Sequence, residues 1–188
     1  MTDILICGVG GQGIVLTSKL IASMAMEKGM TVKSAETIGM AQKGGSVTSF
    51  LRIGAKFSPM FAEGSADIII AFEPSEAVRE LRYLKKGGSV VVNTHPIMPV
   101  TSALTGGTYK AEDMLSYLSG TDCRLISLDA EEYAAKCGSP RTLNMIMLAA
   151  ALQSEVLPFT RDEAVMVMTK TVKPQFVEMN TKALNMTF

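Results

Sequence analysis

The feature that most constrains the fold is a glycine-rich segment, Gly-Val-Gly-Gly-Gln-Gly, at residues 8–13. It ends a short apolar run, residues 2–10, that is typical of a buried strand. After it, apolar side chains recur at helical spacing through residues 13–28, and Gly29 stands where a C-cap is expected. Residues 30–36 again have the composition of a strand. This order predicts a right-handed βαβ unit with parallel strands.

The rest of the chain continues the alternation. We expect strands at residues 46–54, 66–74, 88–94 and 123–129, a loop at 95–110, and helices at 76–87, 111–119, 130–137 and 139–157, followed by two terminal helices. Ser75 is expected to cap the helix at 76–87. The helix at 139–157 is apolar on nearly every side and should be deeply buried.

Length and alternation together predict the fold class. The 188 residues suit one domain, residues 1–188, with C-terminal helices over about 141–188. Strands that alternate with helices predict a three-layer α/β/α sandwich with a mostly parallel, Rossmann-like sheet.

Composition narrows the function classes. Eighteen basic residues balance 18 acidic ones, which argues against a nucleic-acid or anionic-membrane surface. No signal peptide or membrane span is recognisable, so a cytoplasmic protein is expected. Three cysteines cannot supply a four-cysteine iron–sulfur cluster. Zinc is disfavoured because His95 is the single histidine, so no metal site is expected.

The glycine segment is a candidate anion-binding loop. Glycines let a ligand approach the backbone, and the helix that follows directs free N–H groups toward it. Gly8, Gly10 and Gly13 have the spacing of a dinucleotide loop, and Glu36 lies where a ribose-binding acid is expected. A tight turn packed on its own sheet would explain the same glycines. A second glycine-rich loop follows Glu36, where a dinucleotide domain usually enters its next helix, and this weakens the case for an NAD site.

That second loop contains Lys43, Gly44, Gly45 and Ser46. If the two loops follow neighbouring strands, they can face one anionic ligand, with charge from Lys43 and a nest of amides from residues 44–46. The alternative is that the second loop lies against another subunit and Lys43 is solvated.

Other polar residues follow the expected strands without forming a catalytic set. Glu73 fits the ligand edge of the sheet and equally fits the start of a helix. Asn93 either binds a ligand or caps a loop. His95 has no nucleophile to assist, and Asn144 is better explained by an internal hydrogen bond than by substrate contact. No catalytic residue is assigned, and the chain is expected to bind and position.

Four segments together resemble a known family: residues 8–22 (GVGGQGIVLTSKLIA), 35–54 (AETIGMAQKGGSVTSFLRIG), 72–94 (FEPSEAVRELRYLKKGGSVVVNT) and 141–150 (RTLNMIMLAA). They are similar to the gamma subunit or domain of the 2-oxoacid:ferredoxin oxidoreductases, in particular the small (beta) subunit of the indolepyruvate type. The specificity lies in combining G-G-Q-G with G-M-A-Q-K-G-G-S-V. Many chains of this type carry arginine where this one has Lys43, so the charge is kept without a bidentate contact.

The resemblance implies a function. Enzymes of this family oxidatively decarboxylate a 2-oxoacid with coenzyme A (CoA) and reduce ferredoxin, and the indolepyruvate type acts on aryl pyruvates. It further implies that thiamine diphosphate and iron–sulfur clusters belong to a large partner subunit. This chain would then be a non-catalytic subunit, inactive alone and without a cofactor of its own, and the co-substrate CoA is a candidate ligand.

The cofactor-binding candidates are Gly8, Gly10, Gly11, Gln12, Gly13, Glu36, Lys43, Gly44, Gly45, Ser46 and Asn93. Whether the loops contact CoA, the 2-oxoacid or only the large subunit stays open. A stand-alone NAD(P)-dependent dehydrogenase and a CoA- or nucleotide-binding regulatory module are the alternatives. An isolated subunit is also expected to expose an apolar or methionine-rich face.

Overall fold

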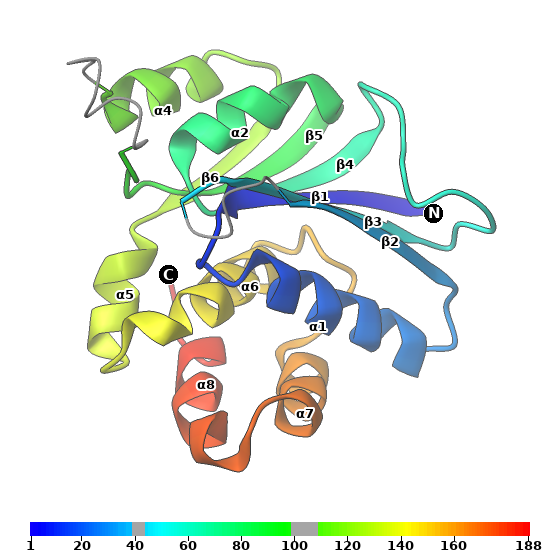
Figure 1. Ribbon diagram of the computed structural model, residues 1–188, viewed down its shortest axis with the longest axis vertical. Coiled ribbons are helices and arrows are strands. Elements are labelled where there is room, and N and C mark those ends of the chain that lie inside the picture. The colour runs from blue at the N-terminus through cyan, green and yellow to red at the C-terminus, as the bar shows by residue number, and fades with distance from the viewer. Residues whose placement is uncertain (39–43, 99–108) are drawn as a thin grey trace.

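The chain is built on one six-stranded sheet (Figure 1). The computed structural model describes residues 1–38, 44–98 and 109–188. The strand order is β2-β3-β1-β4-β5-β6. The strands are β1 (Thr2–Val9), β2 (Val32–Ile38), β3 (Ser46–Ile53), β4 (Ala66–Ala71), β5 (Leu84–Asn93) and β6 (Arg124–Leu128). The predicted three-layer α/β/α sandwich with a mostly parallel sheet is confirmed.

One strand runs against the others. β3 pairs antiparallel with both β1 and β2, while β1, β4, β5 and β6 pair parallel in that order. The β1–α1–β2 unit therefore has parallel strands as predicted, but β2 is not the neighbour of β1. β3 folds back from β2 and lies between them, so β2 is an edge strand.

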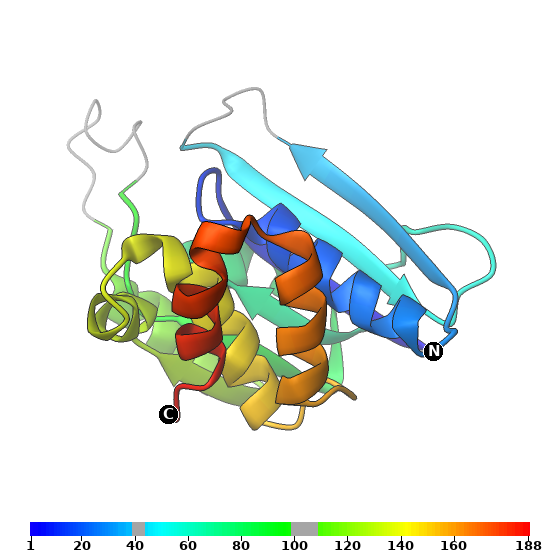
Figure 2. The same cartoon turned by 90° about the horizontal axis from the view of Figure 1, so that it is seen from below.

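Helices cover both faces of the sheet (Figures 1 and 2). α2 (Pro74–Glu80) and α4 (Ala111–Ser119) lie on one face. α1 (Ile14–Glu27), α5 (Ala130–Lys136) and α6 (Leu143–Gln153) lie on the other, and α7 (Arg161–Thr171) and α8 (Val177–Leu184) pack outside them. Short 3-10 turns are η1 (Leu81–Tyr83), η2 (Pro140–Thr142) and η3 (Pro174–Phe176).

The end of α1 follows its sequence signal. Gly29 adopts φ 70°, its N–H donates to the Met26 carbonyl at 2.9 Å, and the Met30 N–H donates to the Ala25 carbonyl at 3.0 Å. This pair of bonds is a Schellman motif, in which a left-handed residue ends the helix. The predicted role of Gly29 in ending the helix is confirmed, although the C-cap position itself is Lys28.

The helix predicted at residues 76–87 exists, but both of its predicted ends are wrong, because α2 spans Pro74–Glu80. Its N-cap is Glu73, whose carboxylate accepts from the backbone N–H groups of Ser75 and Glu76. The helix stops at Glu80, and β5 begins at Leu84, which pairs with Ala66 of β4 ahead of a register shift. Pairing with β4 overrides the local helical pattern.

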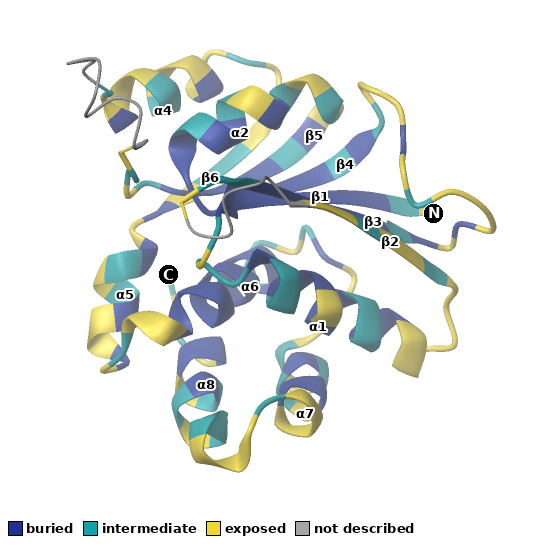
Figure 3. Cartoon of the chain, in the orientation of Figure 1, coloured by how far each residue is buried: buried dark blue, intermediate teal, exposed yellow. Residues whose placement is uncertain are grey.

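The core has two halves, one on each side of the sheet (Figure 3). Ile4 and Ile6 of β1 point into the half under α1 and α6, while Leu5 and Cys7 point into the half under α2. Residues 143–152 of α6 are all buried, as predicted for an all-round apolar helix. No helix in the described ranges is long and apolar enough to cross a membrane.

Candidate functional site

The ends of three neighbouring strands are fastened at one backbone carbonyl. The backbone carbonyl of Phe72, directly after β4, accepts hydrogen bonds from Gln12 Nε2 at 2.8 Å and from Asn93 Nδ2 at 3.1 Å. Gln12 Oε1 also accepts from the Val9 N–H at 2.7 Å. Gln12 thus links the end of β1 to β4, and Asn93 links β5 to the same point. These two side chains shape the carboxyl edge of the sheet.

Two glycines of the first loop, Gly8 and Gly13, lie too close to neighbouring atoms to carry a side chain. A Cβ on Gly8 would lie 2.7 Å from both Gln12 Oε1 and Phe72 Cβ. Gly13, the N-cap of α1, has φ 90°, and a Cβ there would lie 2.9 Å from Asn144 Cβ. Gly11 has φ 108° and no heavy atom within 4 Å of its Cβ position, so it borders open space.

The two glycine loops are joined by backbone hydrogen bonds. The Gly10 N–H donates to the Gly45 carbonyl at 2.8 Å, and the Gly44 N–H approaches the Gly10 carbonyl at 3.5 Å. The β2–β3 hairpin, rather than a second parallel strand, carries Gly44 and Gly45 to the first loop. Lys43, the charge expected in this loop, lies outside the described residues.

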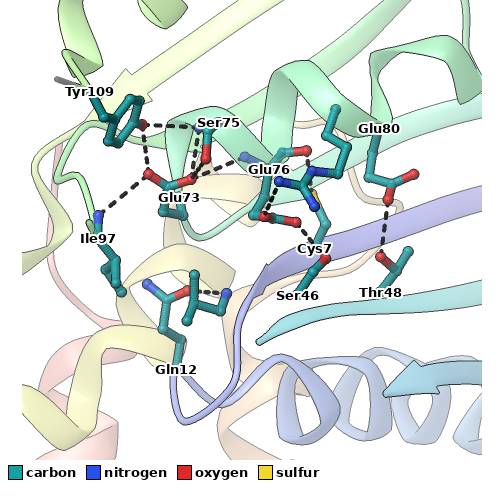
Figure 4. A network of polar contacts seen from close by, with 12 residues as sticks. Cys7, Gln12, Ser46, Thr48, Glu73, Ser75, Glu76, Glu80, Ile97 and Tyr109 are labelled. Carbon is teal, nitrogen blue, oxygen red and sulfur yellow. Dashed lines mark hydrogen bonds and ion pairs between the residues drawn. The ribbon is translucent and has the colours of Figure 1, made fainter. Parts of the chain in front are cut away.

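The second loop is anchored to α2 by a buried carboxylate (Figure 4). Ser46 Oγ donates to Glu76 Oε2 at 2.6 Å. Glu76 is only 5% exposed, and burial raises its pKa against the opposing effects of the Ser46 bond and Arg79. Next to it, burial and the neighbouring carboxylates raise the pKa of the Cys7 thiol. The Ser46 hydroxyl therefore donates its hydrogen bond within the protein rather than to a ligand.

Glu73 forms a second buried anchor at the same edge (Figure 4). Its Oε1 accepts from Tyr109 Oη at 2.6 Å and from the Ile97 N–H at 3.4 Å, while Oε2 caps α2 through Ser75 and Glu76. Burial and the bond to Glu73 raise the pKa of Tyr109. Glu73 therefore acts at the start of a helix and also holds the chain on both sides of residues 99–108.

Cavities open on both sides of the first loop. One, of about 490 Å³, lies between the loop, α5 and the start of α6, and is lined by Gly11, Gly13, Leu16, Glu131, Arg141 and Asn144 among others. The other, of about 610 Å³, lies beside Gly10, Gly13, Lys19 and Val47. The walls are mainly apolar, with a few polar groups, as in most small-molecule sites.

The first cavity can attract an anion. The N-terminus of α1 has no side-chain cap, so its first N–H groups and the helix dipole face this region. Arg141 is exposed at the cavity wall and forms no ion pair with a described residue. Asn144 is 5% exposed, and its side chain forms no hydrogen bond with the described residues, so the internal bond expected from the sequence stays a prediction.

Two further residues predicted to bind a cofactor, Asn93 and Glu36, do not border the first glycine loop with a free side chain. Asn93 is fully buried, and its Oδ1 accepts from the N–H groups of Ala130 and His95 while Nδ2 donates to Phe72 and Glu131. Its amide is therefore fully used within the protein, which favours the capping alternative. Glu36 is exposed on the edge strand β2, opposite Ser49 of β3. It therefore lies two strands from β1, roughly 10 Å away in the sheet, instead of beside the first loop as in a dinucleotide site.

Several site residues were missed by sequence reasoning. Arg141, Glu131 and Glu76 enter the site through packing of distant segments. Asn144 was noticed as a polar residue within the apolar helix at 139–157. Arg141 and Glu76 lie in segments that carry the family resemblance, but neither was singled out, and no motif marked Glu131.

The cysteines do not fit an iron–sulfur cluster in this chain. Cys7 is buried in β1, Cys123 precedes β6, and Cys137 follows α5. Within the described residues, the one group of three or more metal-ligating side chains contains no cysteine. A cluster needs several thiolates around one point.

The sheet order, the joined glycine loops and the open helix N-terminus form an α/β domain whose carboxyl edge can bind an anionic ligand. Residues 3–188 match the family described as pyruvate ferredoxin/flavodoxin oxidoreductase, and the chain belongs to this family. The chain is 38% identical over 187 residues to indolepyruvate oxidoreductase subunit IorB of Archaeoglobus fulgidus, which covers 98% of this chain and 92% of the relative. The predicted family resemblance is confirmed.

Solved structures share the fold at low sequence identity. Pyruvate oxidoreductase subunit PORC of Thermotoga maritima is similar with a TM-score of 0.72 and 21% identity, over 98% of this chain and 93% of that one. The 2-oxoglutarate:ferredoxin oxidoreductase of Magnetococcus marinus, solved with 2-oxoglutarate, coenzyme A and succinyl-CoA bound, gives a TM-score of 0.73 and 17% identity. That match spans 98% of this chain and 30% of the larger one.

Proposed function

We propose that the chain is the small, gamma-type subunit of a ferredoxin-dependent 2-oxoacid oxidoreductase of the indolepyruvate type. The observation that carries this proposal is the end-to-end similarity to the A. fulgidus subunit, 38% identity over 187 residues. The chain acts as one domain that supports the oxidative decarboxylation of aryl pyruvates with CoA. It is inactive by itself, because the described residues of the site include no paired nucleophile and base.

The cofactors belong to the large partner subunit in this proposal. Thiamine diphosphate supplies the decarboxylation chemistry, and iron–sulfur clusters carry the electrons to ferredoxin. The dispersed positions of Cys7, Cys123 and Cys137 support this division of labour. The role left for this chain is to bind and orient.

CoA is the ligand that the joined loops suit best. Its phosphates match the α1 N-terminus, the exposed Arg141 and the amide of Asn144, and its uncharged parts match the apolar walls of the two cavities. Gly11 and Gly13 leave the backbone accessible there. Among the sequence candidates, Gln12, Ser46 and Asn93 contribute by shaping the site.

Anaerobic affinity capture from the chain's own cells tests the subunit assignment. The retained proteins are identified by mass and analysed for thiamine diphosphate, iron and sulfide. A stoichiometric large partner that carries these groups, with aryl-pyruvate- and CoA-dependent ferredoxin reduction, is the expected result. Recovery of the chain alone, together with thermal stabilisation by NAD(P), would overturn the assignment.

The CoA role has a separate test on the captured complex. Arg141→Gln is expected to raise the KM for CoA by roughly tenfold to a hundredfold, because a hydrogen bond to a charged group contributes about 1.5–3 kcal/mol. The kcat and the KM for the aryl pyruvate should change little. Arg124→Gln, an exposed arginine in a different cavity, is the matched control. Equal KM values for CoA in both variants would contradict the CoA role and leave the subunit assignment intact.

A further inference from the structure

Three metal-ligating side chains converge beside the first cavity. His95 follows β5, Asp129 is the N-cap of α5, and Glu131 lies in the first turn of that helix. One ligand atom from each lies within 4.8 Å of the other two. Glu131 also lines the cavity of about 490 Å³ that the first glycine loop borders. The three side chains therefore lie at the edge of the cavity that the first glycine loop borders.

One oxygen of this group is buried without a partner. Glu131 Oε1 accepts from Asn93 Nδ2 at 3.2 Å. Glu131 Oε2 is shielded from solvent and accepts no hydrogen bond from the protein, the single such buried side-chain atom within the described ranges. Leaving a buried carboxylate oxygen unpaired costs free energy, so a bound positive or donor group at this oxygen would stabilise the ionised side chain.

His95 does not fill that role directly. It forms no ion pair within 4.0 Å with either carboxylate, although its ring reaches within 4.8 Å of both. A transition-metal ion bonds nitrogen and oxygen ligands at about 2.0–2.2 Å, so two ligands of one ion are separated by up to about 4.4 Å. The observed separations, at most 4.8 Å, are close to this limit, so a small movement of the exposed His95 and Asp129 side chains would bring all three ligand atoms within bonding distance of one ion.

The surrounding hydrogen bonds hold the ligand groups in place. The buried Asn93 amide binds one oxygen of Glu131, and its Oδ1 accepts from the backbone N–H groups of His95, at 3.4 Å, and Ala130, at 3.0 Å. Asp129 Oδ1 accepts from the Glu132 N–H at 2.9 Å, and Oδ2 accepts from no donor among residues 1–38, 44–98 and 109–188. Supporting bonds of this kind orient the ligands of protein metal sites.

We propose that His95, Asp129 and Glu131 form a binding site for one divalent transition-metal ion. One imidazole and two carboxylates suit Mn²⁺ or Zn²⁺ better than the all-oxygen preference of Mg²⁺ or Ca²⁺. The two carboxylates balance the charge of the ion, and Oε2 of Glu131 gains its missing partner. Water completes the coordination on the cavity side. The site is a property of this chain and does not depend on its assignment as a subunit.

Metal titration of the full, isolated chain tests the proposal. The chain is stripped with a chelator, and Mn²⁺ binding is followed by the electron paramagnetic resonance signal of the free ion. Calorimetry with Zn²⁺ gives the stoichiometry independently. One ion per chain is expected, with a Kd at least about tenfold weaker in His95→Ala and Glu131→Gln, since each removes one ligand. Glu131→Gln retains an oxygen that can accept the Asn93 bond.

A matched control comes from the neighbouring residue. Glu132 is an exposed acid in the same helical turn and is absent from the ligand group, so Glu132→Gln should bind the ion as the unmodified chain does. Mn²⁺ distinguishes this site from adventitious thiol ligation, because it prefers oxygen and nitrogen donors to cysteine. No stoichiometric binding of either ion would overturn the proposal. Binding unchanged in His95→Ala and Glu131→Gln would overturn it as well.

Discussion

Gly8 shows how a glycine in a ligand-binding motif can be required by packing. Its Cβ position is occupied from two sides, by Gln12 Oε1 and Phe72 Cβ at 2.7 Å. Gly8→Ala is therefore expected to lower the free energy of unfolding by about 1–3 kcal/mol, as overpacking does elsewhere. Urea unfolding of the isolated chain measures it. Gly120→Ala, where the nearest atom is 3.5 Å away, is the control, and equal stability of the two variants would refute this account.

Glu76 is expected to make stability depend on pH. Burial raises its pKa in the folded chain, so folding favours the protonated form. The stabilisation is fully present below the ordinary carboxyl pKa and is lost as the pH rises through the folded-state pKa. Glu76→Gln removes this dependence and keeps an oxygen for the Ser46 hydroxyl. Between about pH 4.5 and pH 7, its unfolding free energy should fall less than that of the unmodified chain.

Unfolding series at several pH values measure the effect. Glu178→Gln, which changes an exposed acid in α8, controls for the loss of one charge. If the Glu76→Gln and unmodified chains show parallel pH profiles, the buried carboxylate does not stay protonated preferentially in the folded chain.

At the residue scale, the sequence predicted backbone roles better than side-chain roles. The turn at Gly13 and the stop at Gly29 follow from conformational preference, which is local. Gln12 was chosen as a candidate ligand contact because it lies in the first glycine loop, and Asn93 because it ends a strand. Their partners, the carbonyl of Phe72 and the N–H of Ala130, are 60 and 37 residues away in the chain. Such pairing has no local signal.

At the scale of elements, Gln12 joins β1 to β4. Gln12→Ala removes a donor to Phe72 and an acceptor for Val9, each a net contribution of about 0.5–1.5 kcal/mol. A loss of about 1–3 kcal/mol in unfolding free energy is expected by urea titration. Gln175→Ala, an exposed glutamine in η3, should change stability by less than about 0.5 kcal/mol. A stable Gln12→Ala variant would show that the strand ends hold without this side chain.

Every strand of the sheet was foreseen from the sequence, but the strand order was not. The alternation in residues 46–53 identifies a strand, but it does not say that this strand runs antiparallel between β1 and β2. The end of α2 was also misplaced, since residues 81–87 have helical composition but lie in η1 and β5. In both cases, pairing with distant strands decided the structure. The hairpin is nevertheless what joins the two glycine loops.

At the scale of the whole molecule, the methionines divide between core and surface. Met24, Met145, Met147 and Met168 fill the core, as expected for flexible apolar side chains. Five others beyond the N-terminal residue are prominently exposed, Met26, Met30, Met60, Met98 and Met166. They come from several elements, so the continuous methionine-rich face expected of an isolated subunit stays a prediction.

The glycine-loop edge is where we expect the large subunit to cover this chain. The first amides of α1 have no side-chain cap, and Gly11 borders open space, so amide hydrogens at Gly11 and residues 13–16 should exchange quickly in the isolated chain. Hydrogen exchange followed by mass spectrometry, on the isolated chain and on the captured complex, should show protection of residues 11–16 and 44–46 on assembly. Peptides from α7 and α8, which pack on the opposite side of α6, should change little. Protection confined to those helices would place the partner on the outer helical layer, and the glycine loops would then serve this chain's own ligand without contact from the large subunit.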